Sequence, residues 1–121
     1  MTPAGQPAVL TAHREVDPLL LLPVRLFIAC LLADMRWCED VAVRGALHLD
    51  GRGFAPHVES LRAAGYLDTR TEGRRAKLRL TTLGLDRLAE HVTALQAVAC
   101  TAAELVAAQR DDLRLPLPPE S

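Results

Sequence analysis

The chain has 121 residues, half of them apolar, and 14 Lys and Arg residues against 15 Asp and Glu residues give it a formal net charge of −1. This length fits one small domain, and the apolar content excludes a wholly disordered chain. The near-zero charge also excludes a uniformly basic protein that binds nucleic acid over its whole surface. Any basic function must therefore be confined to one part of the chain.

The two ends of the chain differ in composition from its middle. Residues 1–16 mix Pro, Ala, Thr and Gln without an apolar period, and residues 110–121 contain three prolines behind a charge cluster. Both patterns are typical of tails that take no fixed structure. We therefore expect one domain at residues 17–109 between two disordered tails.

An apolar run at residues 19–33 invites a membrane interpretation. It is shorter than the roughly 20 residues that cross a bilayer, and it contains Pro23 and Arg25. It also lacks the basic start and the small-residue cleavage site of a secretion signal. The sequence therefore predicts a soluble, cytoplasmic protein with no membrane partner.

The first predicted helix begins at Pro23, which suits a first helical turn, and ends near Asp34. Its apolar positions follow a spacing of three and four: Leu26, Phe27, Cys30 and Leu31. Because this helix is apolar on nearly every side, we expect it to be buried on more than one side.

A short second helix is expected from Glu39 or Asp40 to Leu47, because acidic residues suit the first turn of a helix. His48 follows at a turn position. A left-handed backbone conformation there would be mildly strained, and an ordinary exposed turn residue is the simpler interpretation.

The third predicted helix follows the turn-rich residues 50–53 and ends at Gly65, a good left-handed cap. Pro56 has no backbone N–H and biases Ala55 away from the helical conformation. We therefore expect the helix to begin near Pro56 or to bend there. One face of it carries three apolar residues: Phe54, Val58 and Leu61.

A β-hairpin is predicted next, from residues 66–70 and 76–80 joined by a flexible basic tip at 71–75. Residues 62–79 contain six basic and two acidic side chains, a net charge of +4 against −5 for the rest of the chain. Charge is therefore segregated. A basic hairpin in an acidic protein suits contact with phosphates, and a solvated basic face that binds nothing is the alternative.

The last predicted helix begins after Thr81 or Thr82 and runs to about Gln109, about 40 Å. Its apolar residues step by three and four, the period of a helix that packs along a seam. Such a helix is longer than so small a domain can cover, so we expect a homodimer; packing over its own first helix in a monomer is the alternative. The seam consists of Leu85, Leu88, Val92, Leu95, Ala99, Ala102 and Val106.

Three cysteines without a C-x-x-C spacing indicate reduced thiols in the cytoplasm. Cys30 and Cys100 lie in apolar stretches and are expected in a core or an interface. Cys38, beside Trp37 and two acids, is expected to be the most exposed. A redox role there is disfavoured, because neighbouring acids raise the pKa of a thiol.

No arrangement for catalysis stands out. Ser60 and Ser121 lie outside any nucleophile motif, and no Gly-rich phosphate loop follows a strand. His91 and Cys100 are about 13 Å apart along one helix, too far to share a metal within a chain. We therefore expect no enzyme activity, no cofactor and no metal, with a metal site across a dimer as the one alternative.

Four stretches resemble winged helix-turn-helix transcriptional regulators of the MarR/ArsR/PadR-like group, and specifically their small single-domain members. They are PVRLFIACLL at residues 23–32, residues 47–61, LRAAGYL at residues 61–67, and the basic hairpin that leads into LRLTTLGL at residues 78–85. The resemblance implies a mainly α fold with a small β-hairpin and a long C-terminal dimerisation helix. It also implies a bacterial homodimer that binds double-stranded DNA.

In such regulators the third helix enters the major groove while the hairpin, or wing, lies on the backbone. The resemblance therefore implies DNA contacts from seven residues: Arg44, Arg52, His57, Arg70, Arg74, Arg75 and Lys77.

The third helix departs from the family pattern. Ala55, Pro56, Glu59 and Ser60 replace polar or basic residues, and residues 34–61 carry a net charge of −2. A second hypothesis is therefore a winged-helix scaffold with weakened DNA contacts. It would bind a small-molecule effector or a partner protein in a cleft between the first and last helices, near Phe27, Trp37 and Leu88.

Overall fold

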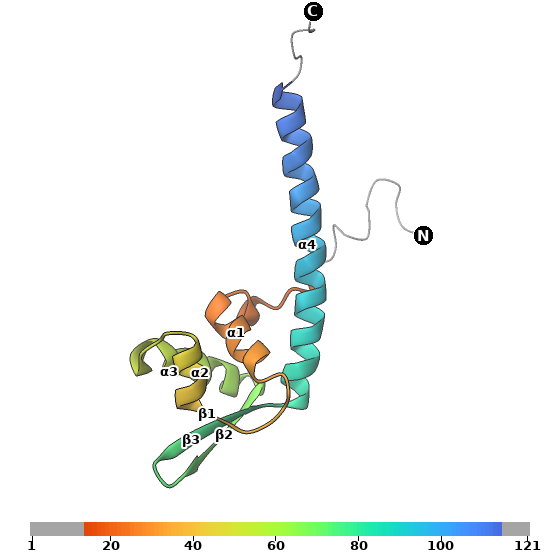
Figure 1. The fold of residues 1–121 in the computed structure, drawn as a ribbon. Coiled ribbons are helices and arrows are strands. Elements are labelled where there is room, and N and C mark those ends of the chain that lie inside the picture. The colour runs from red at the N-terminus through yellow and green to blue at the C-terminus, as the bar shows by residue number, and fades with distance from the viewer. Residues whose placement is uncertain (1–13, 115–121) are drawn as a thin grey trace, which may run out of the picture.

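The computed structural model describes residues 14–114. The other helices and a small sheet pack against one side of the first part of one long helix, whose remainder extends away from them (Figure 1). The fold is therefore mainly α with a small β-sheet, as the sequence predicts. In chain order the elements are η2 (Pro18–Leu20), α1 (Pro23–Leu31), β1 (Cys38–Glu39), α2 (Asp40–Ala46), α3 (Gly51–Ala63), β2 (Leu67–Glu72), β3 (Arg75–Leu80) and α4 (Thr82–Arg114).

The sheet is antiparallel with the order β1-β3-β2. Leu67 pairs with Leu80 at the base of the hairpin, and Glu72 pairs with Arg75 at its tip. β1 adds a third strand, with Cys38 opposite Leu78. The sequence analysis did not predict β1, because two residues are too short to show an alternating pattern.

The core lies where α1, α3, the hairpin and the start of α4 meet. Its fully buried side chains include Ile28, Leu32, Leu61 and Leu80. The largest fully buried side chains in the structure are Leu20, Ile28, Leu32, Leu61, Leu67, Leu80 and His91.

α1 is buried on one side only. Ile28, Ala29 and Leu32 face the core, whereas Phe27 is 51% exposed and Leu31 is 47% exposed. The expectation of burial on more than one side is therefore wrong for a single chain. The remaining elements pack against one side of α1 and leave its second apolar side open.

α3 begins at Gly51, earlier than the sequence predicts. The Asp50 side chain accepts a hydrogen bond from the backbone N–H of Gly53 at 2.7 Å and so caps the helix. The Phe54 side chain is buried in the core and fixes the position of this first turn of α3. Pro56 lies inside the helix, where it removes a single backbone hydrogen bond, and the cap and the buried Phe54 hold the turn before it.

Two glycines lie where the sequence predicts a helix end and a hairpin tip. Gly65 ends the α3 region with a φ of +83°, and the hairpin turns at Gly73, which has a φ of +62°. His48 does adopt the left-handed conformation, with a φ of 55°, and Met35 adopts it with a φ of 61°. Neither residue is glycine, so both positions carry some backbone strain.

α4 has 33 residues, about 50 Å, and continues to Arg114, past the predicted end near Gln109. Residues 110–114 of the expected C-terminal tail are therefore helical, while residues 1–13 and 115–121 lie outside the described part. By length and composition alone, Thr82–Asp111 is apolar enough to cross a membrane. Of its most apolar window, 11% is buried in the structure.

Candidate nucleic-acid interface

One side of α3 packs into the domain and the other is exposed. Phe54 and Leu61 are buried, and Val58 is partly buried. The exposed residues follow one another at spacings that place them on one side of a helix. We call them the α3 face: Arg52, Ala55, Pro56, Glu59 and Arg62.

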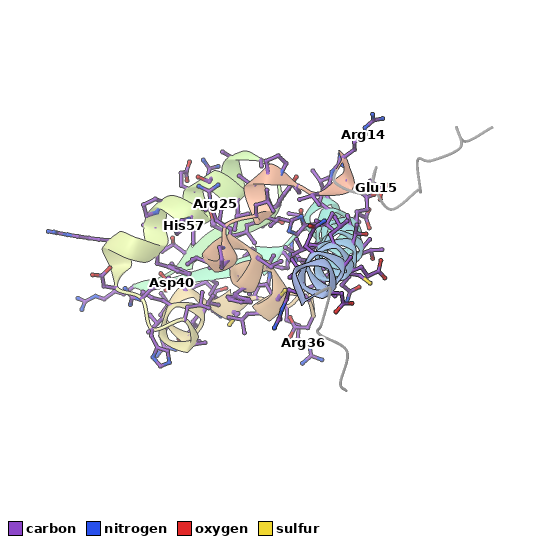
Figure 2. The ribbon with its side chains drawn as sticks, turned by 90° about the horizontal axis from the view of Figure 1, so that it is seen from above. Arg14, Glu15, Arg25, Arg36, Asp40 and His57 are labelled. Atoms are coloured by element: carbon purple, nitrogen blue, oxygen red, sulfur yellow. The ribbon has the colours of Figure 1, made fainter. Side chains whose placement is uncertain are left out.

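His57 does not belong to the α3 face. Its ring is half-buried, and Nδ1 accepts a hydrogen bond from Nε of Arg25 in α1 at 3.1 Å (Figure 2). A second Arg25 nitrogen donates to the Ser60 hydroxyl at 3.3 Å. The sequence predicts that His57 approaches DNA, but the structure directs it toward α1. Arg25, which the sequence analysis did not assign to the site, holds it there.

At the N-terminal end of the α3 face, Arg52 is exposed and forms no ion pair with the described residues. At the other end, Arg62 donates two hydrogen bonds to the Glu59 carboxylate, at 2.8 and 2.5 Å. These bonds hold the pKa of Glu59 below its usual value. The spacing of three residues between Glu59 and Arg62 is the signal that could have predicted this pair.

The hairpin separates its side chains by chemistry, because alternate residues of a strand point to opposite faces. Leu67, Thr69 and Thr71 of β2 lie on the face that also carries Leu78 and Leu80. The opposite face carries only charged residues: Asp68, Arg70, Glu72, Arg75, Lys77 and Arg79.

Carboxylates neutralise most of the basic residues on that charged face. The Glu72 carboxylate forms ion pairs with Arg70 at 2.6 Å and with Lys77 at 3.0 Å. The Lys77 hydrogen bond, and next the Arg70 charge, lower the pKa of Glu72. Arg79 and Arg75 are paired as well, with Asp68 at 3.1 Å and Glu39 at 2.7 Å, respectively.

Arg74 stands apart from these pairs. It is exposed at the hairpin turn beside Gly73 and forms no ion pair with residues that the structure describes. Most of the basic side chains that give residues 62–79 their net charge of +4 are therefore paired with carboxylates. Among the described residues, Arg74 at the hairpin tip is the exception. The sequence could not show this, because pairing depends on the strand register.

Trp37 is covered by two wing arginines. The guanidinium carbons of Arg70 and Arg79 lie 4.3 and 4.4 Å from the centre of its ring. Such contacts are favourable, because the face of an indole attracts cations. Trp37 thereby supports the charged face of the hairpin, a role that the sequence analysis did not assign.

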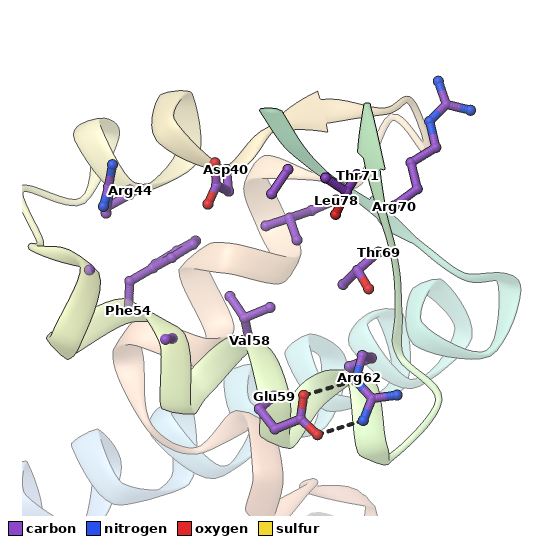
Figure 3. Close-up of a pocket in the computed structure, with 13 residues that line it drawn as sticks. Asp40, Arg44, Phe54, Val58, Glu59, Arg62, Thr69, Arg70, Thr71 and Leu78 are labelled. Carbon is purple, nitrogen blue, oxygen red and sulfur yellow. Dashed lines mark hydrogen bonds and ion pairs between the residues drawn. The ribbon is translucent and has the colours of Figure 1, made fainter. Parts of the chain in front are cut away.

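The three residues predicted to line a cleft, Phe27, Trp37 and Leu88, lie in different surroundings, and Phe27 is 51% exposed. Leu88 is only 5% exposed and belongs to the core, and Trp37 is occupied by the wing arginines. A pocket of about 400 Å³ opens elsewhere, between α2, α3 and the hairpin (Figure 3).

The pocket has an apolar floor and a charged rim. Phe54, Val58 and Leu78 contribute the apolar surface, with the Thr69 and Thr71 side chains beside it. The rim consists of four charged residues from α2 and α3: Asp40, Arg44, Glu59 and Arg62. Of these, the sequence analysis assigned only Arg44 to a site.

The cysteines differ from expectation. Cys30 and Cys100 are exposed in the single chain, while Cys38 is half-buried because β1 pairs with β3. The prediction that Cys38 is the most exposed is therefore wrong. Partial burial raises the pKa of the Cys30 thiol. Within the described residues, no three His, Cys, Asp or Glu side chains gather into a metal site.

No family model and no curated protein matches the sequence, but the fold matches solved structures. The transcriptional regulator homologue from Pyrococcus horikoshii superimposes with a TM-score of 0.64 at 22% identity, over 78% of this chain and 92% of that one. The PcaV regulator from Streptomyces coelicolor, in complex with its natural ligand, gives a TM-score of 0.63 at 23% identity, over 88% and 80%.

A third match is BpsR from Bordetella bronchiseptica, whose DNA binding is regulated by 6-hydroxynicotinic acid. It has a TM-score of 0.60 at 20% identity and covers 85% of this chain and 83% of its own. The first two are described as a homologue of a transcriptional regulator and a transcriptional regulator. The chain therefore has the winged-helix fold of MarR-family transcriptional regulators, and the resemblance noted in the sequence is confirmed for the fold.

Proposed function

We propose that this protein is a DNA-binding transcriptional regulator that acts as a cytoplasmic homodimer. The α3 face would enter the major groove and the wing would contact the backbone. The observation that carries the proposal is the joint position of α3 and the wing tip. Both lie in the half of the molecule away from the free end of α4 (Figure 1), and the α3 face and the wing tip are exposed.

The charges support a local contact with phosphates. Arg52 and Arg74 are exposed and unpaired with described residues, and Arg44 of α2 is half-buried with its side chain beside Gly51, the first residue of α3. The paired cations Arg75 and Lys77 remain available as well, because surface ion pairs contribute little and exchange readily. A DNA phosphate can take the place of the Glu39 or Glu72 carboxylate.

The second half of α4 supports a homodimer. Its seam residues Ala99, Ala102 and Val106 are exposed in the single chain, and small residues let two helices approach closely. A seam on one side of a helix suits a second helix better than a bilayer, which contacts a helix on every side. Light scattering should accordingly give twice the chain mass of 13.2 kDa.

The decisive experiment is a fluorescence anisotropy titration with the protein's own promoter DNA at two salt concentrations. Binding should weaken as salt rises, because bound counterions are released. Arg74→Glu together with Arg75→Glu should lower the affinity at least about tenfold, with repulsion replacing attraction at the wing. A matched control with the same change in charge, Arg14→Glu with Arg87→Glu, lies away from the wing.

Each outcome of this titration has a defined meaning. Absence of binding at low salt, or binding without a salt dependence, contradicts a DNA-binding function. Binding that the wing variant retains in full shows that the wing is not the anchor. Equal losses in the wing and control variants indicate a general effect of charge rather than a specific contact.

The pocket between α3 and the wing favours a second function, regulation by a small molecule. Its volume of about 400 Å³ lies in the range of small-ligand sites, and its apolar floor with a few polar groups is typical of them. We propose it in place of the cleft near Phe27. A ligand there would touch both α3 and the wing, and so would alter their spacing on DNA.

6-Hydroxynicotinate is a suitable probe, because it regulates the similarly folded BpsR. We expect it to weaken DNA binding and to change the fluorescence of Trp37, the only tryptophan, because β2 carries Thr69 and Thr71 beside the pocket and Arg70 over the Trp37 ring. Ala76→Phe should fill the pocket and abolish both responses while DNA binding persists. Responses that survive this substitution would place the ligand elsewhere.

A further inference from the structure

The centre of the α3 face is unusual for a surface that meets DNA. Ala55 and Pro56 are exposed there, and neither side chain has a hydrogen-bonding group. Pro56 also lacks a backbone N–H. The middle of α3 therefore offers only carbon to whatever it contacts.

The polar residues nearest to this centre are engaged elsewhere. The His57 ring accepts a hydrogen bond from Arg25, and the Ser60 hydroxyl donates to the Pro56 carbonyl at 3.0 Å. Farther along the helix, Glu59 and Arg62 satisfy one another with two hydrogen bonds. His57 and Ser60 are therefore directed away from a base edge above Ala55 and Pro56, while Glu59 and Arg62 lie farther toward the C-terminal end of the helix.

Such a surface has one good partner in the major groove. Each base pair presents hydrogen-bonding groups there, and thymine alone among the four bases adds a methyl group. Opposite a G·C pair, the apolar centre would desolvate polar base edges without replacing their hydrogen bonds. Opposite thymine it would bury the methyl group, which is favourable.

We infer that Ala55 and Pro56 read thymine methyl groups at the centre of each half-site, and that Arg52 reads a guanine beside them. This specificity rests on the proposed DNA-binding function. Arg52 is the second residue of α3, exposed and unpaired with described residues, and the N-terminal residues of a recognition helix are those that reach base edges. Arginine binds the two acceptors of guanine with a bidentate contact.

The test uses two pools of randomised DNA duplexes, one made with thymine and one with uracil, which lacks the methyl group but keeps the same hydrogen-bonding groups. The wild-type protein should enrich thymine at the centre of each half-site, with guanine next to it. Replacing one central thymine by uracil should weaken binding about fourfold, the value of one buried methyl group.

A variant links this preference to α3. Ala55→Gln introduces an amide that can bind adenine, so it should remove the difference between thymine and uracil and change the enriched base. Ala89→Gln, at an exposed position of α4, is the matched control and should behave as the wild type. Arg52→Ala should relax the preference for guanine and leave the thymine preference intact.

The outcomes separate the two levels of the proposal. Selection of a specific site that binds equally well with thymine and uracil overturns the thymine assignment and leaves a DNA-binding regulator. Enrichment of G·C pairs at the centre overturns it too. Absence of binding to either pool overturns the proposed function and this assignment with it.

Discussion

The two halves of α4 continue the same apolar seam but lie in different surroundings. In the first half, Leu88 is 5% exposed and His91 is completely buried against the domain. In the second half, Leu105 is 58% exposed and Val106 is 56% exposed. A periodic seam thus indicates that a helix face needs cover, but it does not indicate whether the cover comes from the same chain.

Polar contacts also fasten the first half to the N-terminal segment. The backbone N–H of Asp17 donates to Nδ1 of His91 at 2.8 Å. The Tyr66 hydroxyl donates to the Asp17 carboxylate, which also accepts the N–H of Leu19 at 2.9 Å. These bonds join three segments that are far apart in sequence. The second half of α4 has no comparable contact with the described residues.

At Gly84 the first half of α4 lies too close to the domain for a side chain, and its replacement should have the largest effect. A Cβ atom there would overlap the backbone carbonyl of Tyr66 and lie 2.8 Å from a Leu80 methyl group. Gly84→Ala should therefore lower the free energy of unfolding by about 3 kcal/mol or more. Chemical denaturation measures it.

Gly45→Ala is the matched control for this prediction. It lies in α2, where a Cβ atom would meet nothing within 4 Å. The substitution should raise stability by about 0.5–1 kcal/mol, since glycine weakens a helix interior. If Gly84→Ala proved equally harmless, α4 could not be held against Tyr66 as described.

His91 is the second point of attachment. His91→Leu removes the acceptor of the Asp17 N–H and leaves that group without a partner, which should cost about 1–3 kcal/mol. His91→Gln provides another acceptor and should recover part of the loss. Thermal denaturation of both variants distinguishes a lost hydrogen bond from lost packing, because equal losses would mean that packing alone matters.

Tyr66 reports the same attachment through its ionisation. Burial, followed by the hydrogen bond and the charge of Asp17, raises the pKa of Tyr66 to about 12. The unfolded chain has the ordinary value of about 10. The folded state therefore favours the neutral phenol, and its stability should decrease as pH rises above 10 and through 12.

Tyrosinate absorbance measures this pKa directly, because the chain has a single tyrosine. Asp17→Asn removes the charge and should move the pKa of Tyr66 part of the way back toward 10, since burial remains. An unchanged pKa in this variant would show that Asp17 does not contact the phenol in solution.

Periodicity and turn residues predicted the helices, the hairpin and their order, because those signals are local. The start of α3 was misplaced, because the Asp50 cap and the buried Phe54 outweigh the local effect of Pro56. β1 went unpredicted, because Cys38 and Glu39 form a strand only through pairing with β3.

The candidate site was less predictable than the fold, because it depends on contacts between distant segments. The sequence identifies Arg75 and Lys77 as basic, but only the strand register shows that acids pair with them. His57 lies on the recognition helix, but Arg25 of another helix determines its direction. The pocket similarly joins residues of four elements, α2, α3, β2 and β3.

Substitutions in the exposed half of α4 should disrupt the dimer and leave the stability of the domain unchanged, whereas substitutions in the buried half should lower that stability. Leu105→Glu together with Val106→Glu should change the stability of the monomeric domain by no more than about 0.5 kcal/mol, because exposed side chains contribute little. The same substitutions should convert the dimer to a monomer in light scattering, since the charges introduced at position 106 of the two chains would meet in the seam with those introduced at position 105 beside them. Thr93→Glu, at an exposed position of α4 outside the predicted seam, is the control.

The concentration dependence of unfolding separates the two possible covers of this half. If a second copy covers it, the unfolding midpoint of the wild type rises with protein concentration, and that of the double variant does not. If α4 instead packs over its own α1, the wild-type midpoint is independent of concentration, and the double variant loses stability at every concentration. The second result would contradict the dimer, and it would make both halves of α4 parts of one core.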